Sequence, residues 1–150
     1  MARWPVSVSA ITSDPELRAA FAIRRAVFVE EQGVDPSLEL DGHDQAPEVV
    51  HVLARVGDEP VGTGRIRPVA PATAKVERVA VLPAYRGRGV GREIMRTVES
   101  VIPEGITELL VHSQRAVEGF YEGLGYRRDS GVFVEAGIDH VRMRRSVTAP

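Results

Sequence analysis

Three glycines at alternate positions mark the segment of this chain best suited to chemistry. Gly87, Gly89 and Gly91 follow an apolar run that stops at Pro83, and a helical pattern begins at Ile94. This order predicts a strand, a tight backbone loop and a helix whose N-terminus faces outward. Such a loop points several backbone N–H groups, and the positive end of a helix dipole, at one spot. We therefore expect a phosphate or pyrophosphate site at a glycine loop made of Arg86, Gly87, Arg88, Gly89, Val90, Gly91 and Arg92.

Two common phosphate-binding motifs do not fit the glycine loop. The dinucleotide fingerprint needs glycine at its first, third and sixth positions, and Arg92 occupies the sixth position counted from Gly87. A P-loop ends in Gly-Lys-Ser or Gly-Lys-Thr, and the loop contains neither sequence. The competing interpretation is a glycine-rich turn with solvated arginines.

The glycine loop lies within an alternation of strand and helix patterns. Apolar alternation predicts strands over residues 6–11, 49–56, 61–69, 75–82, 106–111, 126–134 and 138–144. Helical spacing predicts helices over residues 13–32 and 91–102, and a third helix that Ser113 caps and Gly123 ends. Residues 34–47 favour an acidic loop with a helical turn near residues 37–40, and residues 146–150 favour a frayed tail. The expected fold is α/β, a mixed and mostly antiparallel sheet of about seven strands with a central parallel pair, flanked by helices.

Composition indicates one globular domain over residues 1–150. The net charge is −2 and the pI is near 6.1, which argues against a nucleic-acid partner. The chain has no cysteine, so disulfides, thiolate metal sites and a cysteine nucleophile are excluded. No apolar run approaches the ~20 residues of a membrane span, and residues 1–5 lack the apolar core of a signal peptide. We expect a cytoplasmic protein with no membrane partner.

Two motifs resemble those of a known enzyme family. Arg86-x-x-Gly89-x-Gly91, after a strand ending in Val79-Ala80-Val81, resembles the acetyl-CoA signature of the GCN5-related N-acetyltransferases, the GNAT superfamily. A downstream segment resembles that family's helix ending in Phe-Tyr and then Gly-aromatic, in Phe120-Tyr121-Glu122-Gly123-Leu124-Gly125-Tyr126. A narrower similarity to the ElaA-like branch lies in residues 24–32, 39–44, 51 and 135–143.

The resemblance implies a cofactor and roles for several residues. Backbone N–H groups of Val79, Ala80 and Val81 would polarise the thioester carbonyl of acetyl-CoA, at a place where the sheet splays apart. Tyr121 occupies the position of the family's tyrosine that protonates the leaving thiolate, although an aromatic residue there could also be helix core. Ser113 or Gln114 stands where the family often has an asparagine that contacts pantetheine. Phe120, Phe28 and Trp4 are expected in the core or at its edge.

The proton acceptor for the amine is less well indicated. Glu77 precedes Val79 by two residues on the same strand face and could accept the proton, or could form an ion pair with Arg78 or Arg65. His51 and the cluster of Asp41, His43 and Asp44 are rival candidates for the base or for acceptor recognition. The cluster could also be a solvated turn, and no second set of ligands supports a metal there. Carboxylates near the end of the first helix would favour a cationic acceptor, with Glu31, Gln32, Asp41 and His51 as the candidate substrate residues.

These observations favour an acyl-CoA-dependent N-acetyltransferase that acts without a metal. The expected acceptor is a small-molecule or peptide amine, and a homodimer is common for the implied fold. A non-catalytic acyl-CoA sensor of the same fold is the first alternative, and a nucleotide-binding, reductase-like domain is the second.

Overall fold

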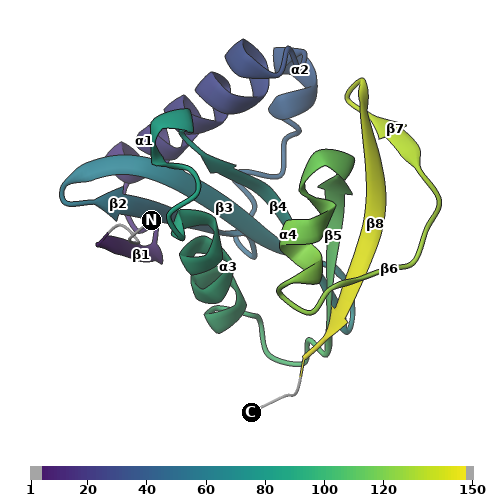
Figure 1. Cartoon of the computed structure of the whole chain (residues 1–150). Coiled ribbons are helices and arrows are strands. Elements are labelled where there is room, and N and C mark those ends of the chain that lie inside the picture. Colours follow the sequence, from purple (N-terminus) through teal and green to yellow (C-terminus); the bar gives the residue numbers. More distant parts are fainter. Residues whose placement is uncertain (1–4, 148–150) are drawn as a thin grey trace.

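The computed structural model describes residues 5–147. Within them one sheet holds eight strands in the order β1-β2-β3-β4-β5-β8-β6, with β7 also paired to β8 (Figure 1). The strands are β1 (Val6–Ala10), β2 (Val50–Val56), β3 (Glu59–Ala70), β4 (Thr73–Val81), β5 (Glu108–Gln114), β6 (Arg127–Arg128), β7 (Phe133–Glu135) and β8 (Ile138–Ser146). The helical segments are α1 (Asp14–Arg24), η1 (Arg25–Glu31), α2 (Pro36–Glu39), η2 (Pro83–Tyr85), α3 (Val90–Ser100), η3 (Arg115–Val117) and α4 (Glu118–Glu122).

The expected sheet class is confirmed. β4 and β5 form the parallel pair, and the other pairings are antiparallel. The strand predicted over residues 126–134 is in fact two short strands, β6 and β7. Between them, the Asp129 carboxylate accepts hydrogen bonds from Arg142 and Arg144 of β8. None of the helices in residues 5–147 is long and apolar enough to cross a membrane.

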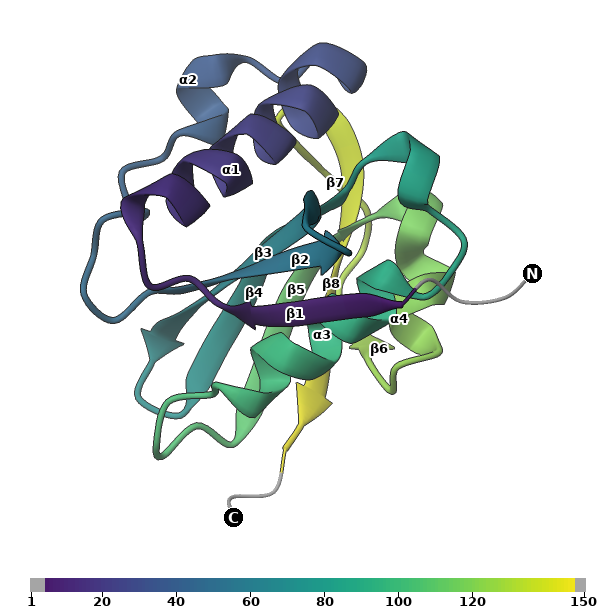
Figure 2. The ribbon, with the colours of Figure 1, turned by 90° about the vertical axis from the view of Figure 1, so that its left-hand side faces the viewer.

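Alternation along β2 gives the sheet two apolar faces. Val52 and Ala54 pack in the main core with α3, whereas Leu53 packs on the opposite face with Ala20 and Ile23 of α1. Helices α1 and α3 therefore cover opposite faces of the sheet (Figures 1 and 2). The close approach of α3 to β3 favours glycine in the strand, since a Cβ atom at Gly62 would lie 2.8 Å from the Ile94 Cδ1 atom and 3.0 Å from the Ala80 carbonyl oxygen.

The first helix begins as predicted and ends in an unexpected form. Ser13 is the N-cap and accepts a hydrogen bond from the Glu16 backbone N–H. The last part of the expected helix, η1, is a π-helix, in which the Gln32 N–H donates to the Val27 carbonyl 3.1 Å away. The wider turn shifts the phase of the residues that follow, a feature frequent at functional sites.

The sequence interpretation was wrong about Ser113. It lies within β5, opposite Val141 of β8, and its hydroxyl donates to the Gln114 carbonyl instead of capping a helix. The strand expected over residues 106–111 runs from Glu108 to Gln114, and only η3 and the short α4 follow it. Ser146 ends β8 instead of starting a tail, while Trp4 and residues 148–150 lie outside the described residues.

Candidate active site

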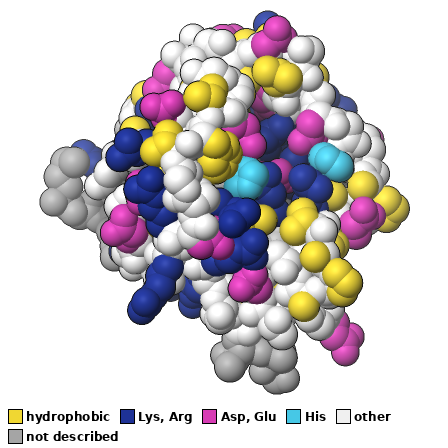
Figure 3. Space-filling model, turned by 90° about the vertical axis from the view of Figure 1, so that its right-hand side faces the viewer, with side chains coloured by type: hydrophobic (Ala, Val, Ile, Leu, Met, Phe, Trp, Pro, Cys, Tyr) yellow, Lys and Arg dark blue, Asp and Glu magenta, His cyan; other side chains and the backbone are white. Residues whose placement is uncertain are grey.

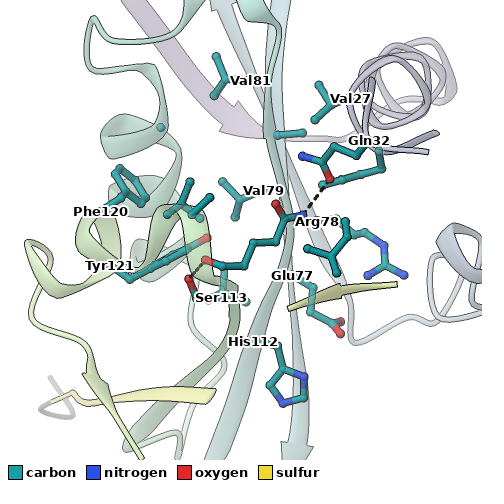
Figure 4. A pocket seen from close by; sticks show the side chains of 18 of the residues that line it. Val27, Gln32, Glu77, Arg78, Val79, Val81, His112, Ser113, Phe120 and Tyr121 are labelled. Carbon is teal, nitrogen blue, oxygen red and sulfur yellow. Dashed lines mark hydrogen bonds between the residues drawn. The ribbon is translucent and has the colours of Figure 1, made fainter. Parts of the chain in front are cut away.

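The main cleft of the molecule opens where β4 and β5 separate. The two strands pair from Thr73 with Glu108 to Val76 with Val111, and no further. Beyond this fork lies a cleft of about 1030 Å³. Figure 4 shows Phe120 and Tyr121 on one side of β4, and Gln32 and Arg78 on the other. The cleft thus reaches both faces of the sheet, as the splay implied by the family resemblance requires.

A β-bulge shapes the open edge of β4. Thr63 of β3 pairs with Ala80, but Arg65 pairs with Glu77, so β4 has one extra residue in this interval. Arg78 takes up the excess with a φ of 57°, in the left-handed region that non-glycine residues seldom adopt. The bulge re-aims the backbone of the following residues, and Val79, Ala80 and Val81 all line the cleft. Their predicted position beside the cofactor is compatible with this geometry.

The glycine loop lines the other end of the cleft. All seven residues from Arg86 to Arg92 contribute to the lining. Gly89 is the N-cap of α3 and has a φ of 93°, a conformation that favours glycine. The first N–H groups of an α-helix have no partner within the helix. The start of α3 therefore presents backbone donors and a positive dipole end to the cleft, as expected for a diphosphate site.

The arginine that opens the glycine loop has protein partners. The Arg86 Nε atom donates to the Val81 carbonyl at 2.9 Å, and its two terminal nitrogens each lie 2.7 Å from a carboxylate oxygen of Glu31. These hydrogen bonds lower the pKa of Glu31. Glu31, predicted to face the substrate, instead ties the end of η1 to the glycine loop.

Tyr121 is buried beneath the cleft. Its ring packs edge-on against Phe120 and Tyr126, with centroids 5.1 and 5.8 Å away. Burial raises the pKa of Tyr121 to about 12, so the phenol stays protonated at neutral pH. Phe120, expected in the core or at its edge, is 37% exposed and lines the cleft, where its ring would lie 3.3 Å from a Cβ atom at Gly91.

Two glutamines bridge the cleft between the end of η1 and β5. The Gln114 Nε2 atom donates to the Gln32 Oε1 atom at 2.8 Å, one of the dashed lines in Figure 4. Ser113 is buried beside them, and all three residues line the cleft. The predicted positions of Ser113, Gln114 and Gln32 therefore converge on one place.

Glu77 sits in a cluster of cations. Its carboxylate contacts Arg65 at 2.8 Å, Arg67 at 2.5 Å and Lys75 at 3.2 Å. Burial alone would raise the pKa of Glu77, but hydrogen bonds and charges from Arg67 and Arg65 outweigh it and hold the pKa at about 2. Such a carboxylate is a weak proton acceptor at neutral pH, so the predicted role of Glu77 as general base gains no support from its surroundings. The alternative ion pair with Arg65 is present.

The acidic loop is not the solvated turn that was expected. Asp44 accepts hydrogen bonds from Arg24 at 2.7 Å and from Arg65 at 2.8 Å, and both arginines are buried. Asp41 also binds Arg65, at 2.7 Å, and lines the cleft. Since buried guanidinium groups need anionic partners, the loop folds back onto the sheet to supply them.

His51 lies outside the cleft. Its Nε2 atom donates to the Asp44 carbonyl at 3.1 Å, and burial lowers its pKa. The residues that line the cleft do not include it. His51 therefore braces the acidic loop, and its predicted part in substrate binding finds no support in this position.

Sequence reasoning gave no role to several polar residues of the cleft. On the face of the sheet opposite Tyr121, the lining includes Arg67, Lys75, His112, Glu135 and His140. Figure 3 shows histidine, basic and acidic side chains gathered around a hollow on this side of the molecule. The parallel pairing of β4 and β5 ends with Val76 opposite Val111, so His112 lies level with Glu77 across the fork. The expected parallel pair could therefore have indicated His112 as a residue of the cleft.

Comparison with known proteins agrees with this geometry. The sequence profile of the acetyltransferase (GNAT) domain matches residues 24–147. YyaT of Bacillus subtilis is 40% identical over 145 residues, which cover 95% of this chain and 97% of YyaT. ElaA of Escherichia coli is 31% identical, with 98% of each chain covered.

Solved structures share the same architecture. The crystal structure of Escherichia coli ElaA superposes with a TM-score of 0.82 and 28% identity, covering 93% of this chain and 99% of that one. A GNAT family acetyltransferase from Elizabethkingia anophelis with acetyl-CoA bound shares the fold at a TM-score of 0.70 and 17% identity, over 95% of this chain and 98% of that one. With its two motifs, its forked sheet and these relatives, the chain belongs to the GNAT family of acetyltransferases.

Proposed function

We propose that the protein moves an acetyl group from acetyl-CoA directly to an amine within a ternary complex. The observation that carries this proposal is the fork between β4 and β5, which leaves the edge of Val79–Val81 open between the glycine loop and the fork. A cofactor with a diphosphate near one end and a thioester at the other suits such a cleft. The fold shared with the acetyl-CoA-bound Elizabethkingia protein supports the same cofactor here.

Each end of acetyl-CoA has candidate partners. The backbone from Gly87 to Gly91 and the start of α3 would hold the diphosphate. The pantetheine arm would run along the free edge of β4 past Ser113 and Gln114, so that the thioester lies near the bulge at Arg78. Backbone N–H groups of Val79–Val81 would polarise the thioester carbonyl.

Tyr121 would stabilise the leaving thiolate. A phenol with a pKa of about 12 remains a donor throughout the neutral range. Full proton transfer to a thiolate whose acid has a pKa of ~8.5 would be uphill, so hydrogen-bond donation to the developing charge suits Tyr121 better. The absence of cysteine agrees with direct transfer, because no thiol can carry an acyl-enzyme.

The acceptor amine would enter from the opposite face. Gln32 and Asp41 line that half of the cleft and are the predicted substrate residues that remain available there. Burial would raise the pKa of Asp41, but Arg65 outweighs this effect and keeps it well below the ordinary range, so Asp41 is anionic. A carboxylate at this mouth would favour a small-molecule or peptide amine that arrives as a cation.

Release of free CoA thiol from acetyl-CoA, measured over a panel of small and peptide amines, tests the proposal. We expect saturable release with at least one amine, and mass spectrometry should find the acetyl group on that amine. Calorimetry should show CoA binding independently of turnover. Saturable CoA binding without acyl transfer to any amine would contradict the transferase and support the acyl-CoA sensor. Absence of CoA binding would overturn both.

A further inference from the structure

Two histidines and a glutamate gather in the acceptor half of the cleft. The His112 Nδ1 atom lies 3.0 Å from the Glu135 Oε1 atom, and the His140 Nε2 atom lies 3.8 Å from the other carboxylate oxygen. Phe133 packs between them, edge-on to His112 at 5.1 Å and stacked on His140 at 6.0 Å. His112, Glu135 and His140 all line the cleft.

Distant parts of the chain build this cluster. His112 comes from β5, one residue beyond the last pairing with β4 at Val111. Glu135 ends β7, and the turn that returns the chain into β8 needs positive φ values at Ala136 (52°) and Gly137 (76°). Figure 4 shows His112 at the end of the cleft away from Val81, below Glu77. A cofactor with its diphosphate on the glycine loop would extend its reactive end toward this position.

The hydrogen bond to Glu135 selects one form of the His112 ring. The bond from His112 lowers the pKa of Glu135, so the carboxylate is ionised and can only accept. The proton of a neutral His112 therefore lies on Nδ1, and Nε2 keeps its lone pair. Within residues 5–147 the Nε2 atom of His112 has no hydrogen-bond partner, and the side chain is 24% exposed in the cleft.

The second histidine is held differently. His140 Nδ1 donates to the Ile138 carbonyl at 2.7 Å, and the side chain is only 8% exposed. Its burial against Phe133 and Glu135 keeps the other ring nitrogen, Nε2, away from a bulky substrate. Three other charged groups lie around the pair. The charge of Lys75 lowers the pKa of Glu135, Glu77 lies beside the fork, and Arg142 is bound to Asp129.

We propose that His112 is the general base of the acetyl transfer and that Glu135 is its positioning residue; this inference rests on the proposed function. The amine, which enters as a cation, first releases one proton to water. Its neutral nitrogen then attacks the thioester carbon, and a C–N bond forms as the carbonyl oxygen takes the electron pair. The nitrogen then gives a proton to His112 Nε2. As the carbonyl re-forms, the C–S bond breaks and the electron pair leaves with the sulfur. His112 afterwards releases its proton to water.

Kinetics with an amine that the wild-type protein acetylates provide the first test. We expect His112→Gln to lower kcat about 100-fold or more, the size of a lost general base, and to remove the acidic limb of the kcat/KM pH profile. Acetyl-CoA affinity should stay within about twofold of wild type, since the cofactor is held elsewhere. His43→Gln, on an exposed residue of the acidic loop outside the cleft, is the matched control and should retain full activity.

Glu135→Gln should weaken catalysis less than His112→Gln, because the amide oxygen can still accept a hydrogen bond from Nδ1 but the amide group can also donate and so no longer selects one tautomer. Normal kcat and an intact acidic limb in His112→Gln would overturn the inference, and so would a larger loss in His140→Gln than in His112→Gln.

Nitrogen-15 NMR of the imidazole rings gives a readout that needs no substrate. At a pH where His112 is neutral, we expect its proton on Nδ1 in wild type and a mixture of tautomers in Glu135→Gln. A proton on Nε2 in wild type would refute the assignment even if the protein proves to be an acetyltransferase. Failure of wild type to acetylate any amine would instead overturn the proposed function, and with it the reaction step.

Discussion

Replacing Tyr121 with phenylalanine removes one hydroxyl and keeps the packing around it. The ring lies between Phe120 and Tyr126, and phenylalanine can make the same edge-on contacts. We therefore expect the free energy of unfolding to change by less than about 1.5 kcal/mol. At pH 7 a pKa of about 12 leaves only about one phenol in 10⁵ ionised, so the wild-type hydroxyl is a donor in nearly every molecule.

The catalytic loss should far exceed that change in stability. A donor aimed at developing charge in a water-poor site contributes a factor of about 10²–10³ to kcat, equivalent to about 3–4 kcal/mol. Tyr126→Phe is the matched control, since this neighbouring tyrosine is 2% exposed and is not part of the cleft lining. Steady-state release of CoA thiol, with calorimetry for CoA binding, measures both variants. A Tyr121→Phe protein with wild-type kcat would refute the role of Tyr121, and equal losses in both variants would indicate disturbed packing.

Three further predictions concern the glycine loop and the buried charges. Gly89→Glu should abolish CoA binding in calorimetry, because a carboxylate would project at the diphosphate site, whereas Gly105→Glu, which shares a positive φ but lies outside the cleft, should bind normally. Urea unfolding should show stability lost as pH falls from about 4.5 toward 2, since the pKa of Glu77 is lower in the folded chain than in the unfolded chain. Glu77→Gln should make this pH dependence of stability shallower, and an unchanged slope would contradict the lowered pKa of Glu77. Arg65→Met should cost about 3–5 kcal/mol of stability, because it removes the buried cation that Asp41, Asp44 and Glu77 share. Arg25→Met, at an exposed ion pair, should cost less than about 1 kcal/mol, and similar costs would refute the buried network.

Local chemistry made much of the fold predictable. The Ser13 cap and the glycine loop before α3 follow from residues close together in the sequence, and the strand–helix–strand order indicated the parallel pair of β4 and β5. The motif containing Tyr121 also led directly to one wall of the cleft. These features depend on backbone conformations or helix ends that few residue types satisfy, so the sequence pattern is informative.

Features that depend on distant partners were harder to foresee. The bulge places Arg78 at a positive φ although nothing in that residue type favours it; its side chain contacts Asp41 and the Glu39 carbonyl from the acidic loop. The buried arginine network likewise joins β3 to a loop more than 20 residues away in the sequence. Hydrophobic periodicity carries no record of such pairings, which is why the acidic loop looked solvated.

Ser113 shows how a local preference can mislead. Serine before a helical apolar stripe is a common N-cap, but here ladder pairing with Val141 continues β5 past it. The extension of β5 also carries His112 and Gln114 to the cleft, one on each side of the buried Ser113. The acceptor half of the site therefore depends on residues 112–114 of β5, which the sequence pattern did not include in the strand.

A crystal structure of the protein with acetyl-CoA would test the central claim most directly. We expect the diphosphate on the backbone of Gly87–Gly91, the pantetheine arm along the free edge of β4, and the thioester carbonyl facing the N–H groups of Val79–Val81. The thioester sulfur should then lie within hydrogen-bond reach of the Tyr121 hydroxyl. Acetyl-CoA bound outside the fork of β4 and β5, or with its diphosphate away from the glycine loop, would contradict the account.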